Sequence, residues 1–198
     1  MLGWEVAGYM LRGQTELISA MILIGAVLVV GIAFSSLATS YVSSIVGRGR
    51  VEQVLMSEQA NLVLYKEFEN GTTLCLGVLR ITPSTTRYAV TLFSMDMKIN
   101  STGAIRIPVT TTTLSKRSVP ASSVHYVYMG DYYPVSGKGY VSVVEVPQDV
   151  IKNYVMQQKP FLVCIDKSSI PSQGAKIMFF IYIGSDLYEV GEWSAYPS

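Results

Sequence analysis

The feature that most constrains this chain is an uncharged apolar stretch close to its N-terminus. The densest apolar block runs from Leu17 to Phe34, and no charged side chain follows until after Gly47. A helix needs about 20 apolar residues to cross the hydrocarbon core of a bilayer, because each residue advances it by about 1.5 Å. Residues 14–46 are apolar on every side, so a helix here is predicted to be surrounded by lipid or by other helices.

Small residues recur inside this stretch at a spacing of four. Gly31, Ser35 and Thr39 form one series, and Ser36 with Ser40 forms another. This spacing places small side chains on one face of a helix, where they let a neighbouring backbone approach closely. Ordinary membrane-helix composition gives the same spacing. The sequence therefore leaves open whether Gly31 and Ser35 are assembly residues.

A glycine- and arginine-rich segment, Gly47-Arg48-Gly49-Arg50, interrupts the apolar pattern. Glycine weakens a helix, so this segment predicts either a hinge or the end of the helix, although the following residues can continue helically. We divide the chain into a leader at residues 1–13, a hydrophobic helix at residues 14–60 and a β head at residues 61–198.

From Asn61 onward the apolar residues alternate with polar ones, as in half-buried strands. The clearest alternating run is Ser94–Asn100, and Ala104–Val109 alternates likewise. Asn70-Gly71 predicts a hairpin, since both residues tolerate positive φ. Further strands are predicted at residues 61–68, 72–82, 124–132, 140–146, 161–165, 175–183 and 187–193.

About nine short strands separated by turns favour an antiparallel sandwich or barrel over an α/β fold. The predicted fold class is therefore α+β, with a long N-terminal hydrophobic helix followed by an antiparallel β-sandwich head of immunoglobulin-like type. Residues 149–158 are predicted to form a short helix or an irregular loop.

The charge balance argues against nucleic acid as a partner. Charged residues make up only 15% of the chain, and the formal net charge is +1. A polyanion is attracted by a net positive field, and a net charge this small supplies none. We therefore expect no nucleic acid among the partners.

The sequence offers no group of residues typical of catalysis. His125 is the only histidine, so a histidine pair cannot bind a metal ion here. Ser136-Gly137-Lys138-Gly139 lacks the spacing of a phosphate-binding loop and predicts a turn instead. The run Thr110–Thr113 predicts an edge strand or exposed loop in preference to an O-glycosylated patch. We expect no enzyme activity, catalytic residue, metal ion or cofactor.

Two cysteines and two N-glycosylation sequons bear on where the head is located. Cys75 and Cys164 could form one disulfide in an extracytoplasmic domain or remain as two buried thiols, and their spacing alone does not decide. The sequons are Asn70-Gly71-Thr72 and Asn100-Ser101-Thr102. Both asparagines are candidate acceptors if the head leaves the cytoplasm.

The junction before the apolar stretch resembles the class III signal peptide of archaeal type IV pilins and archaellins. The resemblance lies in Arg12-Gly13-Gln14-Thr15-Glu16 and the apolar residues that follow, and it extends over about residues 12–45. In that family a membrane peptidase cuts after a small residue, and the hydrophobic segment is retained. The resemblance implies that Gly13 ends the leader, that Gln14 begins the mature chain, and that Glu16 neutralises the new amino terminus of a neighbouring subunit.

The resemblance also implies a function. The family pairs such a helix with a β head that is often glycosylated. The chain would be a structural subunit of an archaeal surface filament, extracted from the cell membrane, where its head faces outward. Its partners would be further copies of itself in a helical homopolymer, a prepilin peptidase and a membrane assembly platform.

Three alternatives remain within and beyond this family. The start of the predicted mature chain favours an adhesive pilus over an archaellum, the filament of motility. The alternative from a different class is that the chain is an uncleaved single-pass membrane protein whose extracellular β domain binds a ligand or partner. A membrane-tethered enzyme ranks last, because the head offers no convergent polar cluster for it.

Overall fold

The computed structural model describes residues 4–98, 100–135 and 139–197, and for residues 4–18, 44, 45 and 48 it describes the backbone alone. Most of the turn predicted at residues 136–139 therefore lies outside the described residues. The chain forms two compact units, Met1–Val51 and Glu52–Ser198, which are described here one at a time.

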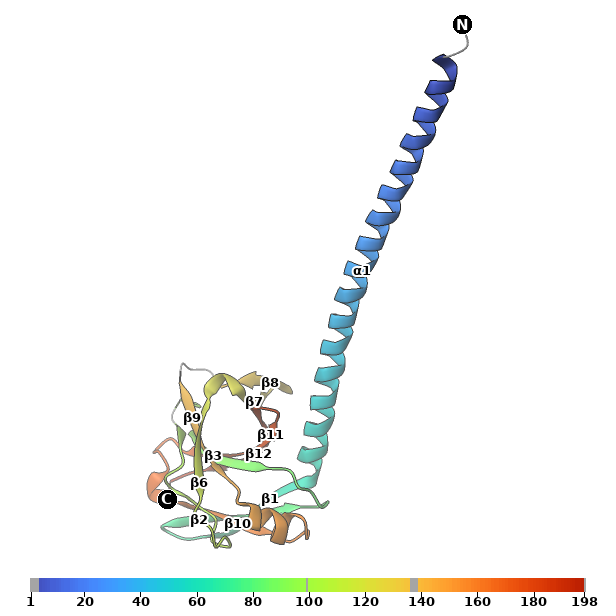
Figure 1. The fold of residues 1–198 in the computed structure, drawn as a ribbon. Helices are drawn as coiled ribbons and strands as arrows, with labels where there is room; N and C mark the ends of the chain where they lie inside the picture. Colours follow the sequence, from blue (N-terminus) through green and yellow to red (C-terminus); the bar gives the residue numbers. More distant parts are fainter. Residues whose placement is uncertain (1–3, 99, 136–138, 198) are drawn as a thin grey trace. The chain divides into compact units, whose positions relative to one another are not determined.

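The first unit consists of helix α1, which spans Trp4–Asn61 and continues into the second unit (Figure 1). The first proline of the sequence is Pro83, so no residue before it removes a backbone donor from the helix. The segment at residues 47–50 lies inside α1, and the helix does not end there. It ends where the Asn61 side chain donates to the Ser57 carbonyl oxygen at 2.7 Å.

The smaller sheet of the second unit has four strands in the order β1-β2-β10-β5, all antiparallel. The predicted hairpin joins the first two, because the Asn70 side-chain oxygen accepts the backbone N–H groups of Thr72 and Thr73 at 2.9 and 2.6 Å. The strands are β1 (Leu62–Glu69), β2 (Thr73–Arg80), β10 (Phe161–Asp166) and β5 (Ile105–Arg106).

The larger sheet has eight strands in the order β6-β9-β3-β11-β12-β7-β8, with β4 paired to β3. It curls into a half-barrel. Its strands are β3 (Tyr88–Ser94), β4 (Asn100–Ser101), β6 (Ser115–Pro120), β7 (Val124–Tyr128), β8 (Asp131–Pro134), β9 (Tyr140–Glu145), β11 (Ala175–Ile183) and β12 (Asp186–Ala195). Short helical segments connect them at Ala121–Ser123 (η1), Gln148–Val150 (α2), Ile151–Val155 (η2) and Lys167–Ser169 (η3).

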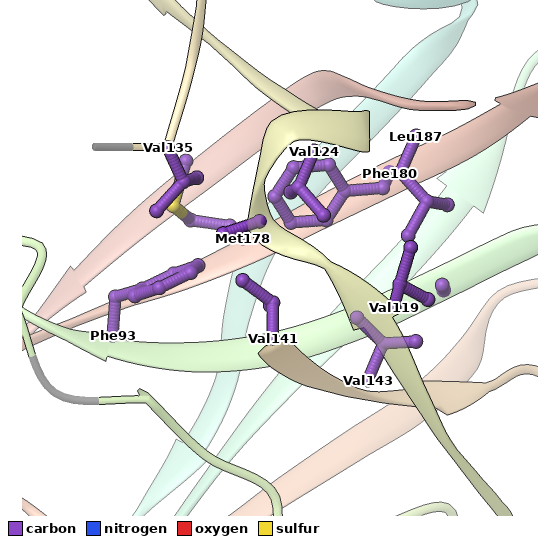
Figure 2. Close-up of a cluster of buried hydrophobic side chains, with 11 residues drawn as sticks. Phe93, Val119, Val124, Val135, Val141, Val143, Met178, Phe180 and Leu187 are labelled. Carbon is purple, nitrogen blue, oxygen red and sulfur yellow. The ribbon is translucent and has the colours of Figure 1, made fainter. Parts of the chain in front are cut away.

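A hydrophobic core fills the concave side of the curled sheet (Figure 2). Phe93 of β3 and Phe180 of β11 are almost completely buried there, together with Met178. Because the sheet curls, aromatic and branched side chains from non-neighbouring strands meet at this point. Each side chain is then covered by others and removed from water. The other labelled members are Val119, Val124, Val135, Val141, Val143 and Leu187.

The α+β class and the largely antiparallel β head are confirmed. Two features of the head differ from the antiparallel sandwich that was chosen over a barrel: the larger sheet is a curled half-barrel, and β7 runs parallel to β12 through the pairs Val124–Leu187 and His125–Tyr188. Strand β6 was not predicted, and neither was strand β3. All seven residues of β3 are buried, so its sequence shows no alternation.

The clearest alternating run, Ser94–Asn100, was wrongly predicted to be a strand. Ser94 ends β3, a turn follows, and Met97 takes a positive φ of 59°. The Asp96 carboxylate accepts the Ser94 hydroxyl and the backbone N–H of Lys98, the latter at 3.2 Å. Such local side-chain hydrogen bonds compete with strand pairing, so this alternating run forms a turn in place of a strand.

Candidate functional site

The apolar part of α1 is one candidate functional region. The segment Ser19–Ser43 has 25 residues and a mean hydropathy of 2.5, which suffices by length and composition to cross a membrane. At 1.5 Å per residue it is about 38 Å long, compared with roughly 30 Å for a bilayer core. Its large apolar side chains between Met21 and Val42 are all more than half exposed. This composition is that of a membrane or secretion segment.

Gly31 and Ser35 lie on one exposed face of this helix. They line a shallow groove together with larger apolar residues, and apart from the adjacent helix backbone no atom lies within 4 Å of the position that a Cβ would take on Gly31. The Thr39 hydroxyl donates to the Ser35 carbonyl oxygen at 2.8 Å, so its polar atom is satisfied within the helix. The remaining residues of the groove are Val27, Leu28, Ile32, Ser36, Ser40 and Ser43.

The predicted processing site lies on the N-terminal part of α1. The backbone of Gly13, Gln14 and Glu16 is helical and continuous with the apolar segment. The side chains of these residues lie outside the described ones, so the roles predicted for them rest on the sequence resemblance.

The sequence left open whether the two cysteines form a disulfide or remain as free thiols, and in the structure they form a disulfide. Cys75 of β2 and Cys164 of β10 are directly opposite each other in the antiparallel register, and both are buried. The bond therefore joins two central strands of the smaller sheet that are 89 residues apart in sequence. Disulfides persist in oxidising compartments, which is consistent with an extracytoplasmic head.

The two sequon asparagines have different surroundings. Asn70 is exposed, and among the described residues its side-chain nitrogen has no hydrogen-bond partner. The Asn100 nitrogen instead donates to the Thr91 hydroxyl and to the Ser142 carbonyl oxygen, and its oxygen accepts the Ser142 N–H at 2.6 Å. Asn100 thus links β4 to β3 and β9. Of the two, Asn70 is the acceptor that an oligosaccharide could reach.

A buried ion pair fixes the last turns of α1 to the head within the second unit. Glu58 and Arg80 are each only 7% exposed, and Arg80 Nη2 lies 2.9 Å from Glu58 Oε1. Arg80 Nε donates to the second carboxylate oxygen at 3.1 Å, which makes the pair bidentate. Tyr88 Oη also donates to Glu58 at 2.7 Å, and the Thr86 hydroxyl does so at 3.2 Å.

These hydrogen bonds determine the charge state of Glu58. Burial on its own would raise the pKa of this carboxyl, but the donors from Arg80, Tyr88 and Thr86 hold the pKa below its ordinary value. Sequence reasoning missed this cluster. One signal was available: Glu58 follows the buried Leu55 by three residues, which places a charge on the face of α1 that packs against the head.

A second buried carboxyl, Glu189, lies where strand pairing is interrupted. The pairing of β11 with β12 passes from Phe179–Gly191 to Phe180–Glu189, so Val190 is a bulge. The parallel pairing of β7 with β12 ends at His125–Tyr188. Just past this pair, Glu189 Oε2 of β12 accepts the N–H of Val127 of β7 at 2.9 Å. The carboxylate thus replaces a backbone acceptor of the sheet. Burial raises the pKa of Glu189 to about 7.

The raised pKa of Glu189 predicts that the head is less stable in mild base. The folded state retains the proton up to about pH 7, whereas the ordinary pKa is 4.5. The contribution of Glu189 to stability is therefore greatest below pH 4.5 and falls as the pH rises toward 7, by roughly 3 kcal/mol in total. Glu189→Gln should raise the free energy of unfolding at pH 8 by up to this amount and change it by less than about 1 kcal/mol at pH 5.

Urea unfolding of the full chain in non-ionic detergent at pH 5 and pH 8 measures this effect. Glu67→Gln is the matched control, because Glu67 is exposed on β1. An unfolding free energy that depends on pH as strongly in Glu189→Gln as in the wild type would refute the assignment.

The remaining polar candidates form no metal site among the described residues, where no group of three or more His, Cys, Asp or Glu side chains is placed to hold an ion. His125 stacks on Tyr188 with ring centroids 4.6 Å apart, and its Nε2 lies 3.5 Å from an Asp186 oxygen. The threonine run at residues 110–113 is a loop outside the sheets, as the preferred interpretation allowed.

Comparison with known proteins gives no match to a family model, to a curated protein or to a solved structure. What identifies the chain is therefore its own architecture. A long apolar N-terminal helix precedes a disulfide-linked β head, and this architecture is consistent with that of the type IV pilins.

Proposed function

We propose that this chain is a structural subunit, a pilin, of an archaeal type IV pilus-like surface filament. The precursor is held in the cell membrane by α1 with its head outside. A prepilin peptidase removes residues 1–13, and an assembly platform then extracts the mature chain into a helical homopolymer. Glu16 neutralises the amino terminus of a neighbouring Gln14.

The exposure of the apolar helix is the observation that carries this proposal. Large apolar side chains point outward on all sides of α1 from Met21 to Val42. Such a helix is stable in lipid and equally stable in a bundle of identical helices, so its transfer between them exposes no apolar surface to water. Contacts that repeat from subunit to subunit without closing generate a fibre.

The head supports a function outside the cell. Its disulfide suits an oxidising environment, and the exposed Asn70 suits a glycan. We place adhesion before motility, so an archaellum subunit is the second candidate of the same class. The candidate of a different class is an uncleaved single-pass membrane protein whose outward β domain binds a ligand or partner.

The amino terminus of the protein on the cell surface distinguishes these proposals. Filaments sheared from cells that express the full chain should yield a protein beginning at Gln14, together with fibres visible by electron microscopy. A detergent-dependent protein that still begins at Met1 and forms no fibres would overturn the filament proposal in favour of the uncleaved membrane protein.

A substitution in the groove tests the packing of α1 within the fibre. Gly31→Leu should reduce the yield of sheared filaments by about tenfold or more, because a bulky side chain prevents close approach of a neighbouring helix. Ala33→Leu is the matched control on the opposite face of the same helical turn. Membrane insertion should be unchanged in both variants, and equal filament yields would exclude close packing at Gly31.

A further inference from the structure

A polar pocket lies at one end of the larger sheet, where β3, β6 and β9 meet. Its volume is about 410 Å³, which is within the range of small-molecule sites. Arg87 and Glu145 flank it on the strand side, and Thr112, Thr113 and Ser115 contribute hydroxyl groups. The other lining residues are Tyr88, Val146, Pro147 and Gln148. A site with this many hydroxyl, amide and charged groups suits a polar ligand.

The loop wall of the pocket is held in place from behind. Thr110 Oγ1 lies 3.1 and 3.0 Å from the two carboxylate oxygens of Asp149, and the Thr111 N–H donates to this carboxylate at 3.1 Å. Desolvation on its own would raise the pKa of Asp149, but the hydrogen bonds from the Thr111 N–H and the Thr110 hydroxyl hold the pKa below its ordinary value. The Thr112 hydroxyl also lies 3.4 Å from Asp149 Oδ1 and 2.9 Å from the Thr110 hydroxyl. Asp149 thus holds the loop through Thr110, Thr111 and Thr112, and the adjacent Thr113 lines the pocket.

The strand wall carries an excess of positive charge. Arg87 and Arg117 both lie close to Glu145 Oε1, at 3.1 and 3.4 Å, and Tyr182 donates to the same oxygen at 2.9 Å. Two guanidinium groups therefore share one carboxylate. The Arg87 guanidinium also lies over the Tyr182 ring, 4.8 Å from its centroid, which orients its plane.

Arg87 retains donors for a ligand. Its side chain is 51% exposed, and among the described residues its one hydrogen bond uses a single N–H group of the five that a guanidinium carries. An oriented guanidinium with free N–H groups suits bidentate contact with a carboxylate. The neighbouring hydroxyl groups of Thr113 and Ser115 suit the hydroxyl groups of a sugar ring.

From this juxtaposition we propose that the pocket binds an acidic sugar of the hexuronate class, with its carboxylate on Arg87 and its hydroxyl groups on Thr113 and Ser115. Arg117 adds long-range attraction from the neighbouring strand. The site lies entirely in the head and does not depend on assembly into a filament. In a surface protein it would provide contact with an anionic polysaccharide.

Ligand-observed NMR of the full chain in non-ionic detergent tests the proposal. Glucuronate should bind about tenfold or more tightly than glucose, which lacks the carboxylate, and than acetate, which lacks the hydroxyl groups. A tetrasaccharide of hexuronates is compared with free glucuronate to distinguish a polysaccharide from a free sugar as the natural ligand. Binding of either one supports recognition of the hexuronate group.

Variants separate the pocket from general charge attraction. Arg87→Gln should weaken glucuronate binding by about tenfold, and Thr113→Val by severalfold. Lys116→Gln is the matched control: Lys116 is exposed on β6 between Ser115 and Arg117, and strand alternation places it on the other face. It should bind as the wild type does. Thr113→Val removes no charge or ion pair, so it tests the site even if Arg87→Gln is poorly folded.

Four results would overturn the proposal. Glucose or acetate could bind as tightly as glucuronate, or Lys116→Gln could weaken glucuronate binding as much as Arg87→Gln does. Glucuronate could also fail to bind at about 20 mM, a concentration that corresponds to only about 2 kcal/mol of binding free energy.

Discussion

Replacing both cysteines, Cys75→Ala with Cys164→Ala, is expected to lower the free energy of unfolding of the head by about 4–5 kcal/mol. The bond closes a segment of 89 residues, so it removes a large amount of conformational entropy from the unfolded chain. It also lies between two central strands of the smaller sheet, where both cysteines are buried. Domains of this size are stable by only about 5–15 kcal/mol, so the loss is a large fraction of the total.

Urea unfolding of the full chain in non-ionic detergent, followed by near-ultraviolet circular dichroism, measures this loss. The same experiment in a reducing buffer is the control, because reduction should bring the wild type close to the double variant. Coincident unfolding of the oxidised wild type and the double variant would mean that the bond does not stabilise the head.

Removing the buried carboxylate, Glu58→Ala, is expected to cost about 3–5 kcal/mol of unfolding free energy. The substitution leaves the Arg80 guanidinium, which is 7% exposed, without its bidentate partner. It also removes the acceptor of the Tyr88 hydroxyl. The last turns of α1 should detach from the head more easily as a result, which hydrogen exchange at residues 52–61 would detect.

The neighbouring exposed carboxyl provides the control. Glu52 is on the same helix and exposed, so Glu52→Ala should change the unfolding free energy by less than about 0.5 kcal/mol. The paired replacement Glu58→Leu with Arg80→Met should recover part of the loss, because it leaves no buried charge unpaired. Equal losses in Glu58→Ala and Glu52→Ala would show that the ion pair has no structural role.

Local patterns in the sequence were sufficient for the parts of the fold that depend on neighbouring residues. The apolar block from Leu17 predicted the helix, because its length and its lack of charge are properties of one continuous segment. Asn70-Gly71 predicted its hairpin for the same reason, since the turn is stabilised by the Asn70 side chain itself. The alternation at residues 94–100 failed, because Asp96 favours a turn.

The sequence by itself determined that a long uncharged helix precedes a β head, since composition and periodicity are local properties of the chain. Tertiary structure alone decided which strands are neighbours, and with them three of the features described above. Pairing of β2 with β10 brings Cys75 to Cys164, and folding of the second unit brings Glu58 to Arg80. The meeting of β3, β6 and β9 forms the pocket at Arg87. The physical reason is that these partners lie far apart in sequence, and only burial of a shared core selects the register that joins them.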